Sequence, residues 1–356
     1  MLMMEKITES LIASIEWAAT LCFRPFKFKK WIILSFCALM AGYLAGGSYN
    51  FSLPNDYKQE VKKQVSHAQS AKPSSFSPEK IIGKAADKIK GHLFIAGSLV
   101  LVFLLIILLS YWLWARFQFI FLENVIKNDA SIRGHFRKHK AAGNSLFGFS
   151  LIIGFLTLLL LGLIVVTGFN AVIKTGVFTE GPKVGILKVI FACLPSVFWF
   201  LLLIFICGII YMILRDFMVP VMYKDGPGAV LAWEKAIAII AANKKDVLLY
   251  VVFKFAVSLV STILYSMIAL AAFVGLLLPL GVLGGAGYLI FLALPKFIHL
   301  AYFISVFILF VPLLFSFWYF FICLYLPFAV FARTFSLKFI GRIDNEYNLF
   351  KIQTIE

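Results

Sequence analysis

Residues 146–169 have the sequence LFGFSLIIGFLTLLLLGLIVVTGF, which contains no charged side chain. A hydrocarbon core about 30 Å thick is crossed by roughly 20 apolar residues in a helix. The stretch is therefore long enough to cross a bilayer as one helix, and a soluble core does not need such a run. It predicts an integral membrane protein.

Composition extends this prediction to the whole chain, 1–356, as a single all-α domain. Of 356 residues, 62% are hydrophobic and 14% are charged, against about 45–50% and about 25% in soluble domains. Residues 1–30 lack the short apolar run and cleavage site of a signal peptide. We therefore expect a polytopic transmembrane helical bundle with about six spans: Trp31 to Tyr49, Leu93 to Ala115, Leu146 to Phe169, Val189 to Leu214, Val247 to Phe273 and Phe297 to Tyr325.

The distribution of arginine predicts how the bundle is oriented. With six spans, all seven arginines fall in segments 1–30, 115–145, 215–246 and 326–356, and basic residues favour the cytoplasmic side of a membrane. We expect a bacterial inner (cytoplasmic) membrane protein with both termini, and these four segments, in the cytoplasm. They also account for much of the formal charge of +16, so no nucleic-acid partner is expected.

Two further segments bear on this threading. Segment 50–92 must be an external loop although it contains eight lysines, and long loops follow the charge rule less strictly. Within it, Ser77 and Pro78 are typical of the start of a helix. Segment 274–296 is apolar but rich in Gly and Pro, and it could form a seventh span or a re-entrant or external element. A seventh span would place Arg333 outside, so we favour the second alternative.

A repeat at an offset of 99 residues organises the predicted spans. Arg116–Asn144 and Arg215–Asn243 each begin where a span enters the cytoplasm, and each precedes an outgoing span. A third copy opens the chain at residues 1–30. The predicted unit is an interfacial helix, a basic turn and a transmembrane hairpin, used three times in parallel. The second copy has an apolar stripe at the spacing of an interfacial helix: Ala229, Trp233, Ile237 and Ile240.

Charged side chains avoid the predicted spans, with one exception. All 17 acidic residues fall in loops and tails under this threading. Proton and sodium pathways usually need intramembrane carboxylates, so we do not expect an ion-coupled pump. Lys254 lies roughly 10 Å past Val247 inside a span, at 1.5 Å per residue. It could contact an anion or phosphate in a cavity, or extend its long side chain to the interface.

Basic clusters at the cytoplasmic ends of the spans predict contacts with anionic lipid. His135 and His139 lie one helical turn apart, but the cations beside them disfavour a metal ion. No metal, cofactor or catalytic motif is expected, and the five scattered cysteines are interpreted as small buried hydrophobic residues. The candidate lipid- or anion-binding residues are Arg24, Lys27, Lys29, Lys30, Arg133, Arg137, Lys138, Lys140 and Lys254.

Several motifs are distinctive: FIFLENV at 119–125, GNSLF at 143–147, DFMVPVMY at 216–223, RPF at 24–26 with Trp31, and LPF at 326–328 with Arg333. With these motifs the chain resembles an uncharacterised group of bacterial polytopic membrane proteins. The architecture of this group is similar to the membrane domain that accompanies some glycerophosphodiester phosphodiesterases. This chain has no phosphodiesterase domain, so the resemblance implies a fold and neither an activity nor functional residues.

The sequence supports three functions in decreasing order. The first is a membrane protein without enzymatic activity, which contacts anionic lipid and acts as a subunit or scaffold for a membrane-protein partner or a second copy of itself. The second is a passive transporter or lipid-translocating protein. The third is a membrane-bound enzyme that acts on lipid substrates.

Overall fold

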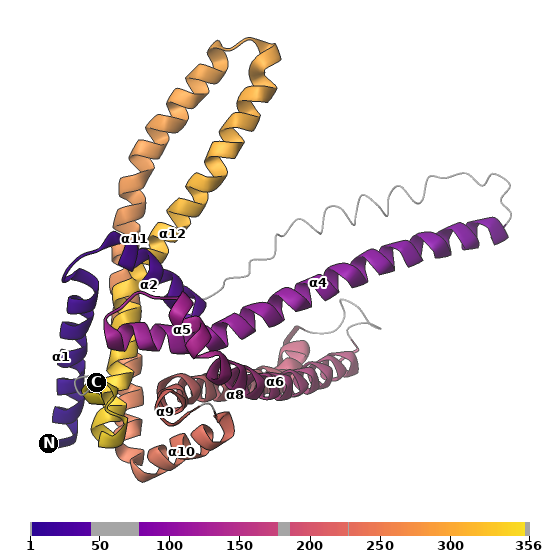
Figure 1. Cartoon of the computed structure of the whole chain (residues 1–356). Helices are drawn as coiled ribbons and strands as arrows, with labels where there is room; N and C mark the ends of the chain where they lie inside the picture. The colour runs from indigo at the N-terminus through magenta and orange to yellow at the C-terminus, as the bar shows by residue number, and fades with distance from the viewer. Residues whose placement is uncertain (1, 44–77, 177–185, 227, 353–356) are drawn as a thin grey trace. The chain divides into compact units, whose positions relative to one another are not determined.

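The computed structural model describes residues 2–43, 78–176, 186–226 and 228–352, and these ranges contain helices and turns but no strand (Figure 1). The chain divides into two compact units. One is Ala45–Tyr111, whose described part is the beginning of α4 (Pro78–Lys127). The other consists of Met1–Leu44 and Trp112–Glu356. All features below belong to this second unit unless stated otherwise.

Among the described residues, five helical segments are long and apolar enough to cross a membrane. Their large apolar side chains are exposed on all faces of the isolated chain, for example Leu159 at 55% and Leu278 at 75%. A helix that is apolar all round suits contact with lipid. This confirms an all-helical chain with the composition of a membrane protein. The five segments are Gly97–Lys127, Lys140–Lys174, Leu187–Asp225, Lys244–Ala293 and Lys296–Ile343.

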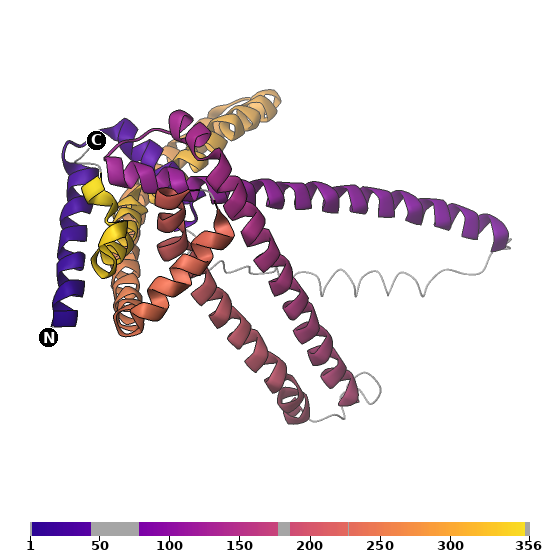
Figure 2. The ribbon, with the colours of Figure 1, turned by 60° about the horizontal axis from the view of Figure 1, so that its bottom comes forward.

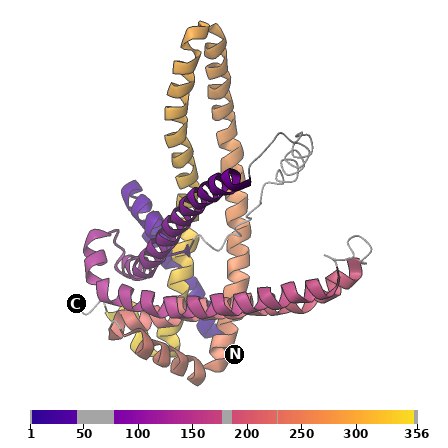
Figure 3. The ribbon, with the colours of Figure 1, turned by 90° about the vertical axis from the view of Figure 1, so that its right-hand side faces the viewer.

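Four of the long helices pair into two hairpins. α6 (Lys140–Lys174) and α8 (Ile186–Ile213) lie side by side (Figure 2). α11 (Lys244–Ala293) and α12 (His299–Ile343) form the second hairpin, which is joined by the short helix η4 (Lys296–Ile298) (Figure 3).

Segment 274–296, expected to be a separate element, instead continues α11 as far as Ala293. Its Pro279 lies inside the helix, and its many glycines do not interrupt it. Near the tip of the hairpin, the Tyr302 hydroxyl donates to the Gly287 carbonyl oxygen at 2.6 Å. The long apolar context therefore outweighs the local helix-breaking tendency of Gly and Pro.

The buried core lies where the hairpins begin and end, and we call this region the helical base. It contains the first residues of α6 and α11, such as Leu146 and Tyr250, together with the last part of α12. The other elements of the base are α1 (Leu2–Phe23), α2 (Phe28–Met40), residues 112–127 of α4, α5 (Arg133–Lys138), the π-helix η3 (Leu214–Met218), α9 (Val219–Asp225), α10 (Ala229–Ala242), η5 (Asn345–Tyr347) and α13 (Leu349–Ile352).

Two helices extend further into the base than the sequence predicts. α4 continues past Ala115 to Lys127, and α12 continues past Tyr325 to Ile343. These extensions are largely buried, so residues expected in an interfacial helix and in a terminal tail form core helix instead. The thickness of a bilayer limits the spanning part of a helix and does not limit the helix itself.

The residues of the predicted apolar stripe on α10 differ in burial. Ala229 is buried, Trp233 and Ile240 are partly buried against the core, and Ile237 is 38% exposed. The buried face of α10 is Ala229, Ala232, Ala236 and Ile239. Small side chains on this face allow helices to approach closely.

The two internal copies, residues 116–144 and 215–243, contain a similar order of elements. In each, the end of a long helix is followed by a turn, a shorter helix and the start of the next long helix. The equivalence of three copies stays a prediction. α4 begins at Pro78, as predicted, while residues 44–49 of the first expected span and residues 50–77 of the expected external loop lie outside the described residues.

Candidate functional site

The basic residues of the α1–α2 turn lie on the surface of the helical base. Arg24, Lys27 and Lys29 are exposed. Lys30 is half-buried, and its Nζ donates to Asn128 Oδ1 at 2.5 Å. This bond joins the α1–α2 turn to the α4–α5 turn. The structure therefore brings together two basic segments that are far apart in the sequence, since Lys30 and Asn128 are separated by 98 positions.

The second basic segment, α5, forms one wall of an apolar groove. Arg133 and Arg137 lie one helical turn apart on α5 and are exposed, as is Lys140 at the start of α6. The groove has a volume of about 460 Å³, within the range of roughly 300–1,000 Å³ typical of ligand sites. Its surface is almost entirely apolar, and Arg133 and Arg137 of α5 border it. The lining residues are Phe36, Met40, Leu113, Phe117, Ile132, Arg133, Phe136 and Arg137.

Arg116 lies near this groove and is held by aromatic rings and one hydrogen bond, while its buried Nε has no hydrogen-bond partner. Its guanidinium lies 4.0 Å from the centre of the Trp112 ring and 4.6 Å from that of Phe136. Its Nη2 donates to Asn144 Oδ1 at 3.0 Å. The first and last residues of the first internal copy are thus in contact, and α4 and α6 meet at this point.

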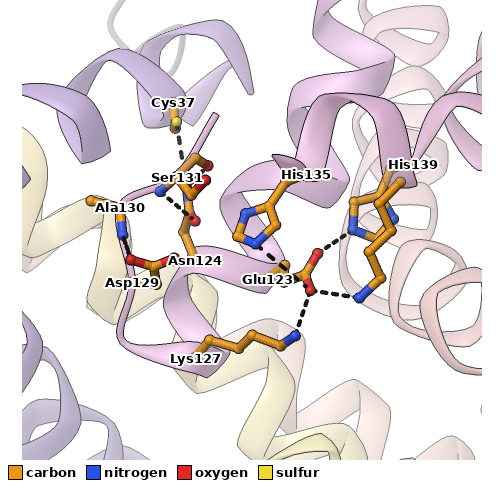
Figure 4. A network of polar contacts seen from close by, with 10 residues as sticks. Cys37, Glu123, Asn124, Lys127, Asp129, Ala130, Ser131, His135 and His139 are labelled. Carbon is orange, nitrogen blue, oxygen red and sulfur yellow. Dashed lines mark hydrogen bonds and ion pairs between the residues drawn. The ribbon is translucent and has the colours of Figure 1, made fainter. Parts of the chain in front are cut away.

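A second feature of the base is the Glu123 cluster, formed by Glu123, Lys127, His135, Lys138 and His139 (Figure 4). The Glu123 carboxylate is completely buried and receives Lys127 at 2.8 Å and Lys138 at 2.6 Å on Oε1. His139 Nε2 lies 2.5 Å from Oε2, and His135 Nε2 lies 3.8 Å from Oε1. Lys138 is therefore directed toward Glu123 while its side chain remains 54% exposed.

The turn beside this cluster is fixed by Asn124 (Figure 4). Its Nδ2 donates to the Ser131 carbonyl oxygen at 3.1 Å, and its Oδ1 accepts from the Ser131 amide at 3.2 Å. The short helix α5 is thereby held in place at the end of α4. Within the described part of the chain, no group of three or more His, Cys, Asp or Glu side chains is arranged to hold a metal ion.

The third feature is the Asp216 cluster, formed by Arg215, Asp216, Tyr250, Lys254 and Arg333. Asp216 Oδ2 accepts from the Tyr250 hydroxyl at 3.1 Å and forms an ion pair with Lys254. Arg215 Nε lies 3.4 Å from Asp216 Oδ1. Arg215 and Asp216 are neighbours in the π-helix η3, a form of helix that often marks functional sites. Lys254 is thus paired with Asp216 inside the protein.

The two buried carboxylates, Glu123 and Asp216, are 0% and 2% exposed and lie in the long apolar helices, beyond the ends of the 20-residue spans that the sequence predicts. The absence of acidic residues from the spans themselves stays a prediction. The sequence contained a signal for them, because each acid is followed and preceded within a few positions by large apolar residues. Limiting each span to about 20 residues assigned them to loops instead.

Comparison with known proteins places the chain in a family without giving it an activity. No curated protein and no solved structure matches the chain. The model of DUF7544, described as a family of unknown function, matches residues 6–350, which is nearly the whole chain. The chain therefore belongs to DUF7544, a family of unknown function.

Proposed function

We propose that this protein binds anionic phospholipid at its helical base, with one acyl chain in the α2–α4–α5 groove and the phosphate on Arg133 and Arg137. The observation that carries the proposal is the groove itself, whose surface is almost entirely apolar and which is bordered by the exposed residues Arg133 and Arg137. Apolar surface favours the acyl chain, and the planar guanidinium group matches the geometry of a phosphate.

The surrounding charge supports the same ligand. Arg24, Lys27 and Lys29 are exposed on the turn that Lys30 joins to the α4–α5 turn. A basic residue near an anionic membrane surface contributes about 1 kcal/mol to binding. The groove supplies selectivity for a lipid over a soluble anion, and the basic turn adds attraction that depends on salt.

In this proposal the chain is a non-enzymatic membrane subunit or scaffold. It lies in a bacterial inner membrane with both termini in the cytoplasm. Its lipid-binding base anchors it, and the apolar hairpins contact a membrane-protein partner or a second copy. A cysteine introduced at Arg342 tests the orientation. We expect an impermeant thiol reagent to label it in inside-out vesicles and not in intact cells, and labelling in intact cells contradicts the proposed orientation.

Lipid binding is tested on the purified full-length chain in neutral detergent by native mass spectrometry. We expect phosphatidylglycerol to be retained more strongly than phosphatidylcholine. In the double variant Arg133→Gln/Arg137→Gln we expect affinity to fall at least tenfold, which corresponds to about 1.4 kcal/mol. The matched control is Lys244→Gln/Lys245→Gln, which removes two exposed charges at the start of α11.

Competition with glycerol phosphate distinguishes lipid binding in the groove from binding to a patch of charge, because glycerol phosphate has the same phosphoryl group but no acyl chains. We expect it not to displace the lipid at concentrations where lysophosphatidylglycerol, with one chain, does. Equal loss of binding in the Arg133/Arg137 variant and in the Lys244/Lys245 control refutes a specific site at the groove.

A further inference from the structure

The Asp216 cluster contains more positive charge than its protein partners neutralise. Two cations, Arg215 and Lys254, contact a single carboxylate, Asp216, and a third, Arg333, donates to the backbone carbonyl of Arg215. Among the ion pairs of the described residues, Asp216 is the one acid that contacts any of these three side chains. Arg333 is 0% exposed, and the side chains of Arg215 and Lys254 are 15% and 18% exposed. Burying charge without a partner is costly.

The hydrogen bonds of Arg333 show where the missing partner belongs. Its Nη1 donates to the Arg215 carbonyl oxygen at 2.5 Å, which fixes the orientation of the guanidinium plane. Its Nε and Nη2 are buried and have no hydrogen-bond partner. These two nitrogens share one edge of the guanidinium group. That edge is the one that binds a carboxylate or phosphate through two parallel hydrogen bonds.

The other groups of the cluster leave this edge for a ligand. Asp216 is occupied by Tyr250 and Lys254. Arg215 lies over the Tyr43 ring, with 4.5 Å between the guanidinium carbon and the ring centre. The Tyr43 side chain lies beside the Arg333 guanidinium, and its hydroxyl is buried without a close hydrogen-bond partner, so a further polar group lies in the same region. The partly exposed Lys254 and Arg215 give the cluster its contact with the surroundings.

We propose that the Asp216 cluster binds one phosphoryl anion, held by the Nε and Nη2 edge of Arg333 in a positive environment supplied by Arg215 and Lys254. Asp216 lowers the net charge of these side chains from three positive to two. The anion is either free phosphate or the phosphate of a lipid headgroup, since basic pockets between spanning helices bind such headgroups.

This site is separate from the groove, because it is built from η3, α11 and α12 rather than from α2, α4 and α5.

The experiment uses the purified full-length chain in neutral detergent at constant ionic strength. One arm titrates inorganic phosphate against chloride, and the other titrates dihexanoyl phosphatidic acid. Binding is measured by isothermal titration calorimetry and by the shift of the thermal unfolding midpoint. Saturable binding in the first arm identifies free phosphate, and binding in the second arm alone identifies a lipid headgroup.

Two substitutions at Arg333 test the proposed edge. Arg333→Lys keeps the positive charge but removes the paired donors, so we expect affinity to fall at least tenfold, as in Arg333→Gln. Arg342→Lys, on the same helix and partly exposed, is the matched control and should bind like the wild type. The groove variant Arg133→Gln/Arg137→Gln should also bind normally, which separates this proposal from the proposed function.

A second variant keeps the proposal testable if the Arg333 variants do not fold. Lys254→Met leaves the Arg333 edge intact and removes one of the three cations, so we expect binding at least threefold weaker. Absence of binding in both arms with the wild type overturns the proposal. Wild-type affinity in a folded Arg333→Lys or Lys254→Met protein overturns it as well.

Discussion

The Glu123 and Asp216 clusters are built from the same materials but differ in where their surplus positive charge lies. Each has one buried carboxylate and several cations at the end of a long apolar helix. In the Glu123 cluster the side chains of Lys127 and Lys138 are 37% and 54% exposed, so water stabilises the charge that Glu123 does not neutralise. In the Asp216 cluster Arg333 is completely buried and two of its nitrogens have no partner.

This difference separates a structural cluster from a candidate site. A buried carboxylate with every oxygen engaged stabilises the fold when it is complete and is costly to break. A buried cation with free donors is incomplete in the protein alone, and it gains from a ligand. Counting hydrogen bonds and exposure for each member distinguishes the two cases, whereas charge counts alone do not.

The largest expected loss of stability is from Glu123→Gln, which removes the one negative charge among four basic side chains. Loss of one partner in a buried ion-pair network costs about 3–5 kcal/mol, so we expect a clearly lower thermal unfolding midpoint in detergent. Glu234→Gln, on the exposed face of α10, is the control and should unfold like the wild type. Equal stability of the two variants would show that the Glu123 cluster is not a structural element.

A smaller effect is expected from Gly143→Ala, which tests the packing that places α4 beside α6 near the Glu123 cluster. A Cβ atom at Gly143 would lie 2.5 Å from Arg116 Cγ and 3.1 Å from Arg116 Cα, so the helices must separate. Overpacking of this kind costs about 1–3 kcal/mol. We expect the same thermal measurement to show a lower midpoint.

Gly148→Ala is the matched control for this prediction, because it lies on the same helix and a Cβ atom there has no neighbour within 4 Å. We expect Gly148→Ala to be neutral or slightly stabilising, since alanine favours the helix. A stable Gly143→Ala protein would mean that α4 and α6 do not meet at Arg116.

The contrast between the two clusters also shows what sequence patterns can predict. The apolar runs predicted the five long apolar helices, because a bilayer selects length and composition directly. Within the first expected span, Trp31 to Tyr49, α2 ends at Met40. The rule gave no place in a helix to Glu123 and Asp216, since it ends a span where the bilayer ends and says nothing of helix that continues into protein. Lys254 was recognised as unusual, but its partner Asp216 lies 38 positions away and only the fold brings them together.

The basic groove was predictable in part. Arg133 and Arg137 were recognised as anion-binding candidates from charge alone, and the structure places both beside apolar side chains from α2 and α4. No periodicity within α5 indicates Phe36 or Met40, because these residues come from a helix about 100 positions earlier. Arg333 was assigned to a tail, and its burial follows from the packing of α12 against α1, α2, α11 and η3.

The smallest loss of stability is expected at the outer edge of the base, where Asp225 and its partners are partly exposed. Tyr347 donates to Asp225 Oδ2 at 3.0 Å, and Lys235 lies 2.5 Å from the same oxygen. Tyr347→Phe removes one hydrogen bond, worth about 0.5–1.5 kcal/mol. We expect a small decrease in the unfolding midpoint at pH 8, well below the effect of Glu123→Gln. An equal effect would mean that exposure does not decide the strength of these clusters.

The same region sharpens the comparison through its dependence on pH. Burial, with a further contribution from Asp225, raises the pKa of Tyr347 above its ordinary value of about 10. The hydrogen bond to Asp225 raises the pKa of Lys235 above about 10.4. Because both folded-state pKa values exceed the unfolded ones, the stabilisation is complete below about pH 10 and is lost as pH rises through the folded values. Unfolding midpoints measured from pH 8 to pH 11 should therefore fall at the alkaline end, and less steeply in Tyr347→Phe, because the variant has no phenol to deprotonate.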